Sequence, residues 1–388
     1  MKKMICILLA AVTGILCLNA ASAETEAVSI KELPGITSPV WKQTYEAYGR
    51  TIDVDAEVYI PETETVPILT VKRNSALAEP LKSELEEAYK KADRKDKTHY
   101  YDLISRGTEY TYLTYIKHAV PLSCGKTKKT DVWKEGMTSD DMDLIRYDPD
   151  RAYAENNSMT VREAETVAQT QLKELYPGLE AKLDTVLLFG RNYWKKSKKM
   201  ISEKGYYSLE FNQCFRGIPS VACIQDTYLN KPVRPDGYSW NKIQNARIHS
   251  AVYGEDSWSL VCQLYQETGV VKEDVSLLPF DAVKDRVEAL IMNGNVRWIN
   301  SVRLGYVLFD TNTSGEYMLA PCWVVWCEYL EGGPEAEKEY GVNDDELLFT
   351  GNNGYYKALI FDAQTGKMFD MESTADDRFL YPGIEGGI

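Results

Sequence analysis

Alternation of apolar and polar residues predicts β-strands along much of the chain. In residues 51–60, TIDVDAEVYI, every second side chain is apolar and most of the others are acidic, which is typical of a strand with one buried face. Pro61 ends this strand, because proline lacks the N–H that a sheet ladder requires. Strand character recurs at residues 108–120, 183–190, 206–215, 218–224, 246–253, 258–265, 296–310, 316–330 and 355–371.

Apolar residues at helical spacing predict three helices, at residues 75–92, 160–176 and 280–293. In the second helix, Thr160 and Glu163 form a capping box, in which each side chain binds the other residue's backbone N–H. Pro177-Gly178 ends that helix. The apolar stripes are Val161, Ala164, Ala168, Leu172 and Leu175 in the second helix, and Phe280, Val283, Val287 and Leu290 in the third.

A helix followed by a run of antiparallel strands occurs twice. This order predicts an α+β fold with two tandem helix-plus-antiparallel-sheet units, at residues 155–272 and 275–388. Residues 24–150 are predicted to form a preceding N-terminal α+β domain, whose role the pattern does not indicate. Within it and beyond, residues 125–158 are rich in turn-forming and charged residues, which predicts a loop region and a boundary.

The first 23 residues have the pattern of a secretory signal peptide. Lys2 and Lys3 precede an apolar stretch at 4–18, and Ala21-Ser22-Ala23 supplies small residues for cleavage. We therefore expect a secreted or cell-surface protein whose mature chain begins near Glu24. An uncleaved anchor is the alternative, because residues 4–23 approach the roughly 20 residues that span a bilayer. Membrane contact is expected only in that case.

The chain is strongly acidic. Beyond the signal segment, which carries two lysines, 42 basic and 58 acidic residues leave a net charge of −16. Such a charge argues against nucleic acid and anionic lipid as main partners, because both carry negative charge. The remaining candidates are a protein or a cell-wall ligand outside the membrane.

Six cysteines follow the signal segment, and their pairing is left open because six cysteines allow 15 connectivities. Cys322 and Cys327 lie in the stretch APCWVVWCEYL. On a strand, residues five apart point to opposite faces and lie roughly 16–17 Å apart, too far for a disulfide or a shared metal. We therefore predict a strand here. The full set is Cys124, Cys214, Cys223, Cys262, Cys322 and Cys327.

One segment matches the first half of a calcium-binding loop, with candidate ligands at Asp310, Asn312 and Ser314. The twelfth position, where a bidentate glutamate completes such a loop, is Pro321. The segment also lies between two predicted strands, where Asn, Ser and Gly form hairpin turns. The prediction is a turn, with no metal and no cofactor.

No catalytic residue is assigned, since the sequence contains no metalloprotease, esterase or phosphate-loop motif. The three histidines, His99, His118 and His249, are widely separated in sequence. The 26 tyrosines and eight tryptophans leave an alternative, a glycan- or wall-binding protein with exposed aromatic side chains. An uncharacterised hydrolase is the second alternative.

Three stretches carry a resemblance to a known family. Residues 159–175 (MTVREAETVAQTQLKEL) resemble the opening helix of PepSY-type modules, and residues 206–221 (YYSLEFNQCFRGIPSV) resemble their strand–turn–strand. Residues 320–330, with the hairpin KALIFDAQTGKMFD that follows, are similar to the closing strands. The same layout occurs in YycH/YycI-like regulators of Gram-positive bacteria and in uncharacterised exported clostridial proteins. The resemblance covers about residues 155–388.

The resemblance implies an extracytoplasmic, non-enzymatic role, in which the protein binds a protease, a sensor kinase or the cell wall. It carries over no catalytic residue. The YycH/YycI-like proteins keep an N-terminal membrane helix, whereas Ala21-Ser22-Ala23 favours cleavage here. This difference argues against direct control of a membrane kinase.

Overall fold

The structure is a computed structural model, and it describes residues 26–74, 94–98, 101–106, 109–114, 122–128, 137–144, 150–153, 159–194, 200–221, 246–255, 257–311, 313, 315–329 and 355–369. The predicted helix at 75–92 lies outside these residues. The described part contains sixteen strands and three helices.

The strands are β1 (Val40–Ala47), β2 (Arg50–Tyr59), β3 (Ile68–Asn74), β4 (Arg94–Thr98), β5 (Tyr101–Arg106), β6 (Glu109–Thr114), β7 (Leu122–Lys128), β8 (Met137–Leu144), β9 (Ala181–Trp194), β10 (Met200–Phe215), β11 (Ile218–Pro219), β12 (Arg247–Gly254), β13 (Ser257–Lys272), β14 (Val296–Asp310), β15 (Glu316–Tyr329) and β16 (Tyr355–Asp362). The helices are α2 (Leu33–Ile36), α5 (Val161–Leu175) and α6 (Asp281–Met292).

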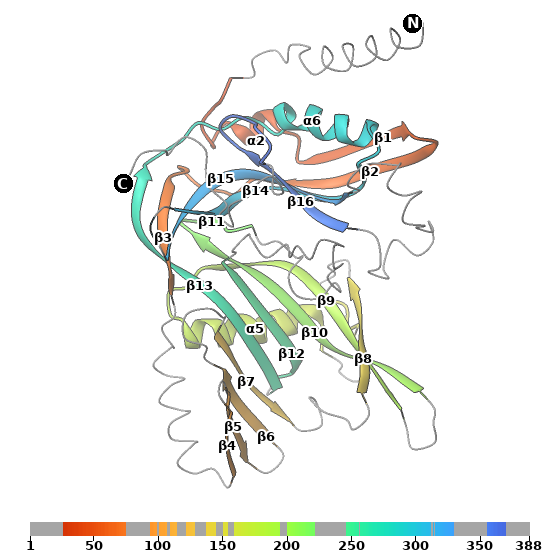
Figure 1. Cartoon of the computed structure of the whole chain (residues 1–388), viewed down its shortest axis with the longest axis vertical. Helices are drawn as coiled ribbons and strands as arrows, with labels where there is room; N and C mark the ends of the chain where they lie inside the picture. The colour runs from red at the N-terminus through yellow and green to blue at the C-terminus, as the bar shows by residue number, and fades with distance from the viewer. Residues whose placement is uncertain are drawn as a thin grey trace, which may run out of the picture.

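The prediction of an α+β fold built from tandem helix-plus-sheet units is wrong. All sixteen strands belong to one mixed sheet, with the main order β1-β2-β14-β15-β3-β13-β12-β10-β9-β8 (Figure 1). The physical reason is long-range pairing. β2 pairs in parallel with β14, and β3 pairs with both β13 and β15, so strands from the N-terminal region complete the sheet of the C-terminal region.

Long strands extend across the boundaries that were predicted between the units. β13 is 16 residues long, and its first part pairs with β12 and β7 while its second part pairs with β3. It therefore runs from the lower to the upper half of the sheet (Figure 1). The loop predicted at 125–158 is also wrong in part, because β8 forms there and pairs along β9.

The two largest buried clusters of the described residues lie on the two halves of the sheet. In the upper half, α6 packs on β1 and β14, and in the lower half α5 packs on β12 and β10 (Figure 1). The capping box of α5 forms as predicted, since the Glu163 N–H donates to Thr160 Oγ1 at 3.3 Å and the Thr160 N–H to Glu163 Oε2 at 2.7 Å. The five stripe residues predicted for this helix are all buried.

In the upper half, the predicted strand at 51–60 is β2, and its apolar residues from Ile52 to Val58 are buried while those between are exposed. The stripe of α6 differs by one position from the prediction. The buried residue in its last turn is Ile291, and Leu290 is only partly buried.

Candidate functional site

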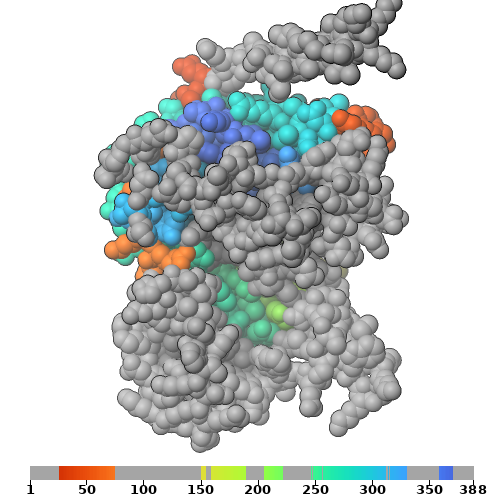
Figure 2. Space-filling view, viewed as in Figure 1, coloured from red at the N-terminus to blue at the C-terminus, as the bar shows by residue number. Residues whose placement is uncertain are grey.

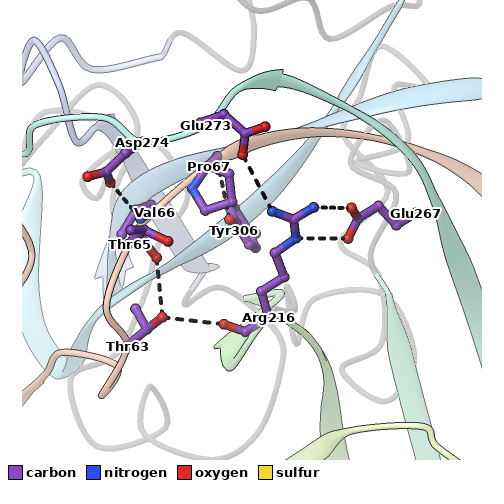
Figure 3. A network of polar contacts seen from close by, with 9 residues as sticks. All are labelled: Thr63, Thr65, Val66, Pro67, Arg216, Glu267, Glu273, Asp274 and Tyr306. Carbon is purple, nitrogen blue, oxygen red and sulfur yellow. Dashed lines mark hydrogen bonds and ion pairs between the residues drawn. The ribbon is translucent and has the colours of Figure 1, made fainter.

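The two halves of the sheet meet at a hairpin between β10 and β11. Its two-residue turn is Arg216-Gly217, with φ of 52° and 80°, and Phe215 pairs with Ile218 across it. Positive φ at both turn positions is the geometry whose twist matches paired antiparallel strands. After this hairpin the chain passes beside β14, where the Val221 N–H donates to the Tyr306 carbonyl oxygen at 2.8 Å. The turn thus places Arg216 at the junction (Figure 3).

Arg216 is bound by a carboxylate from β13. Its Nε lies 3.3 Å from Glu267 Oε2 and its Nη2 lies 2.5 Å from Glu267 Oε1, so the contact is bidentate. Its Nη1 faces Glu273, just beyond β13, at 3.9 Å from Oε2. The hydrogen bonds that Arg216 donates to Glu267 raise the pKa of Arg216, which keeps the guanidinium charged.

A loop between β2 and β3 completes this Arg216 network. Thr63 Oγ1 shares its proton between the carbonyl oxygens of Thr65, at 3.2 Å, and Arg216, at 3.4 Å. The Val66 N–H donates to Asp274 Oδ1 at 2.9 Å. The hydroxyl of the buried Tyr306 donates to the Pro67 carbonyl oxygen at 2.7 Å (Figure 3). Burial raises the pKa of Tyr306, so this hydroxyl remains a donor at any physiological pH. The carboxylates of Glu267 and Glu273 and the loop therefore hold Arg216, and Asp274 and Tyr306 in turn hold the loop.

The ionic groups of the network remain accessible to solvent. The side chain of Arg216 is 41% exposed, that of Glu267 33% and that of Glu273 83%. Arginine stays protonated in proteins, so Arg216 cannot act as a general base. A guanidinium beside two carboxylates can instead recognise charged groups: an anionic group at Nη1, or a cationic group at Glu273.

A second polar cluster lies on the sheet face opposite α5. Ser208 Oγ lies 2.7 Å from His249 Nε2, and His249 is directly opposite Glu210 in the β10–β12 register. Ser208 and Glu210 are buried. A serine, a histidine and a carboxylate resemble a hydrolytic triad in composition. However, β10 lies between β9 and β12 and pairs with both, so its backbone donors here belong to ladders and supply no oxyanion hole.

Ser208, Glu210 and His249 are not grouped by any pattern in the sequence. The signal was available, because polar residues alternate with Tyr207, Leu209 and Phe211 along β10. Which strand lies beside β10 is set by long-range pairing, and the sequence pattern carries no information about it.

A third polar contact crosses between the halves. Asp184 of β9 forms an ion pair with Arg303 of β14, and its side chain is only 3% exposed. Asn212 Nδ2 also donates to Asp184 Oδ1 at 3.1 Å, and Thr185 Oγ1 donates to Oδ2 at 3.1 Å. Burial lowers the pKa of Arg303. This carboxylate holds β9 and β14 together and is too enclosed to meet a ligand.

The candidate calcium ligand Asp310 is the last residue of β14, and Asn312 and Ser314 lie outside the described residues. Thr311 Oγ1 donates to the Glu316 carbonyl oxygen at 2.9 Å, across the connection to β15. Pro321, at the twelfth loop position, lies within β15 opposite Tyr306. Within the described ranges, no group of three or more histidine, cysteine or acidic side chains could hold a metal ion.

The predicted strand around Cys322 and Cys327 is confirmed. Both residues lie in β15, and both are buried. Burial also raises the pKa of Cys322. Cys214 is partly buried and Cys262 is buried, Cys223 lies outside the described residues, and of Cys124 only its place in β7 is described.

The described aromatic side chains mainly build the core. Trp41, Trp258, Trp323 and Trp326 are buried, and Trp41 and Trp323 both pack on Phe280 beside α6. Among the large hydrophobic side chains whose exposure the structure describes, Tyr48 is the exposed aromatic one. The aromatic side chains whose exposure the structure describes therefore form no flat platform of exposed rings.

No family model matches the sequence, and no curated protein matches it. Among solved structures, the fold is similar to an uncharacterized protein from Eubacterium rectale ATCC 33656, at 16% identity and a TM-score of 0.48. That match covers 89% of this chain and 99% of the other. Across the described residues, none of the helices is both long enough and apolar enough to span a bilayer.

Proposed function

We propose that the protein is an exported, non-enzymatic binding protein that acts at the cell surface, and that the Arg216 network is part of its contact surface. The partner would be a protein or a cell-wall ligand that presents charged groups. Export is supported by the pattern of residues 1–23, and a regulatory binding role by the resemblance to PepSY-type and YycI-like proteins.

The observation that carries this proposal is the geometry of Arg216. Its guanidinium is held by Glu267 through two hydrogen bonds, yet 41% of the side chain remains exposed. A group that is already ordered loses little conformational entropy when a partner binds, so the contact costs less. Arginine is also enriched at the energetic centres of protein interfaces.

The surroundings favour recognition over chemistry. The nearest ionisable groups to Arg216 are carboxylates that accept from it or lie beside it, and Glu273 is largely free to meet a second charge. Such an arrangement provides an anion-binding and a cation-binding group a few ångströms apart. It therefore suits a partner segment that carries both charges, such as an extended polypeptide.

Crosslinking in the host cell, with the tagged full-length chain and mass spectrometry, tests the proposal. Glu273→Ala and Arg216→Lys are the test variants, because the first removes an exposed carboxylate and the second keeps the charge but loses the bidentate fork. Arg162→Ala is the matched control, since Arg162 is 61% exposed in a surface ion pair on α5.

A partner recovered with the wild type and the control, and reduced at least fivefold with both test variants, is the expected result. Equal recovery with all four proteins would remove the Arg216 network from the contact surface. The same spectra report the mature N-terminus. A chain that begins near Glu24 supports cleavage, and a retained signal segment indicates a tethered protein.

A further inference from the structure

β1 is a long, regular strand at the end of the sheet. It pairs with β2 over all eight residues without a bulge, and the strand order of the described residues ends with it (Figure 1). The β1–β2 hairpin, coloured orange, lies beside α6 at the margin of the molecule (Figure 2). Natural proteins usually shorten, bend or cover such an edge, because it can pair with another chain.

The alternation of hydrogen-bonded and non-hydrogen-bonded residue pairs between β1 and β2 shows which backbone groups of β1 point away from the sheet. The Val58 N–H donates to the Pro39 carbonyl oxygen at 2.8 Å, and the turn Tyr48-Gly49, with φ of 52° and 72°, closes on the pair Ala47 and Arg50. Both observations place the odd-numbered residues of β1 in hydrogen-bonded pairs with β2. The N–H and C=O groups of the even-numbered residues therefore point away from the sheet.

Val40, the first of these residues, is satisfied locally, because Ser38 Oγ accepts from its N–H at 3.4 Å and donates to its carbonyl oxygen at 2.7 Å. Lys42, Thr44 and Glu46 have no such partner for their outward backbone groups among the residues that the structure describes. Three donors and three acceptors therefore lie in a row along the edge.

The charged side chains of β1 match those of a second copy of β1 that runs in the opposite direction. Lys42 and Glu46 are exposed on one face, with Thr44 halfway between them. Antiparallel pairing of two copies centred on Thr44 places each Lys42 opposite Glu46 of the partner subunit. Centring the pair on Lys42 or on Glu46 would bring like charges together, which destabilises a sheet.

The same register brings together two exposed apolar side chains. Val40 is 44% exposed and Tyr48 is 62% exposed, although both are large and hydrophobic. Each lies four residues from Thr44, so Val40 of one copy meets Tyr48 of the partner subunit at both ends. The positions of the outward backbone groups, of the charged side chains and of the exposed apolar side chains thus all favour the same register, centred on Thr44.

We propose that β1 is a self-association edge, at which two copies of this chain pair antiparallel about Thr44 and join their sheets into one. The pairing forms six backbone hydrogen bonds, two for each facing pair among Lys42, Thr44 and Glu46. The interface is isologous, so it closes as a dimer with two-fold symmetry. This inference does not depend on the proposed function, because the Arg216 network lies elsewhere.

Sedimentation velocity of the purified full-length chain over a hundredfold concentration range tests the dimer. Lys42→Glu alone and Glu46→Lys alone each place like charges in both facing pairs, and each should weaken dimerisation at least tenfold. An equimolar mixture of these two variants should dimerise again, because the acidic edge of one chain then meets the basic edge of the other. No intrachain effect predicts this recovery.

A backbone variant tests the hydrogen bonds. The N–H of Thr44 points outward, so Thr44→Pro removes it without breaking a bond to β2, and proline is tolerated at such edge positions. It should weaken dimerisation about tenfold, whereas the matched Thr44→Ala should stay close to the wild type. Thermal unfolding of each variant verifies that the hairpin is intact.

Three results would overturn the proposal. The first is a wild-type monomer at every concentration, which would leave the edge to an extended segment of another protein. The second is a dimer that is indifferent to Thr44→Pro and to both charge reversals, which would place the interface elsewhere. The third is a mixture of the two charge variants that stays monomeric, which would exclude the register centred on Thr44.

Discussion

Gly305→Ala tests the contact that joins the two halves of the sheet. β11 crosses β14 at Gly305, where the chain from Pro219 to Val221 lies directly against the strand. A Cβ at residue 305 would lie 2.7 Å from the Pro219 carbonyl oxygen and would also overlap the side chain of Val221. Backbone cannot move aside as the end of a flexible side chain can, so β11 would be displaced.

The expected cost follows from two opposing effects. Overpacking a close contact costs typically 1–3 kcal/mol, and contact with backbone places this site near the upper end. Replacing glycine with alanine also restricts the unfolded chain, which returns about 0.4–1 kcal/mol. The net loss in the free energy of unfolding is therefore about 2 kcal/mol. The matched control is Gly254→Ala, since Gly254 also lies in a strand and nothing lies within 4 Å of its Cβ position.

Denaturant unfolding of the wild type and both variants, followed by circular dichroism, measures the difference. Gly305→Ala should unfold at a lower midpoint, and Gly254→Ala at or slightly above that of the wild type. Adding Val221→Ala to Gly305→Ala should restore only part of the loss, because the contact with the Pro219 carbonyl remains. If Gly305→Ala and Gly254→Ala unfold at the same midpoint, the close crossing of β11 over β14 does not exist.

Three further contacts can be tested, the first two by denaturant unfolding and the third by the rate of thiol alkylation. Thr160→Ala should lower the free energy of unfolding by about 1 kcal/mol, because it removes the N-cap of α5. Hydrogen bonds from Thr160 lower the pKa of Glu163, so the capping contribution should be present at neutral pH and lost as pH falls through that lowered pKa. Arg303→Met should cost about 3 kcal/mol by leaving Asp184 buried without its cation, and adding Asp184→Leu should recover most of it. Burial raises the pKa of Cys214 to about 11, so alkylation of this thiol in the folded protein should be slow at pH 8 and accelerate steeply toward pH 11, whereas an ordinary rate at pH 8 would contradict its burial.

Local patterns predicted the elements that depend on nearby residues. The alternation in 51–60 predicts both β2 and its buried face, and Thr160 with Glu163 predicts the start of α5. For α6 the stripe was wrong by one residue at its end, where Leu290 and Ile291 are both apolar. In that case the packing against the sheet decides which side chain is buried, and spacing alone cannot.

The fold class failed because it depends on which strands pair. A helix followed by strands, repeated twice, suggests two closed units, yet the pairs β2–β14 and β3–β13 join residues 190 or more positions apart. Strand propensity and alternation are the same for either partner. The long β13 adds to the difficulty, since it belongs to both halves and no break in its sequence marks the change of partner.

In the candidate site, too, the local structure could be predicted from the sequence and the contacts between distant segments could not. The strand–turn–strand around Arg216-Gly217 was predicted, and it forms as the β10–β11 hairpin. The partners of Arg216 could not be predicted from the sequence, because Glu267 and Thr63 come from segments that only the assembled sheet brings to the turn. The sequence contains 58 acidic residues, so charge alone selects no pair.

These observations also connect stability with the proposed role. Arg216 is positioned by a turn whose exit strand is held at Gly305, so a substitution that displaces β11 should displace the guanidinium as well. Gly305→Ala should therefore weaken partner recovery in the crosslinking experiment, although residue 305 itself is covered by Val221 and the Pro219 carbonyl. Gly254→Ala should leave recovery unchanged. If Gly305→Ala lowers the free energy of unfolding and leaves recovery of the crosslinked partner unchanged, then partner binding does not depend on the position of Arg216. The contact surface then lies elsewhere on the sheet.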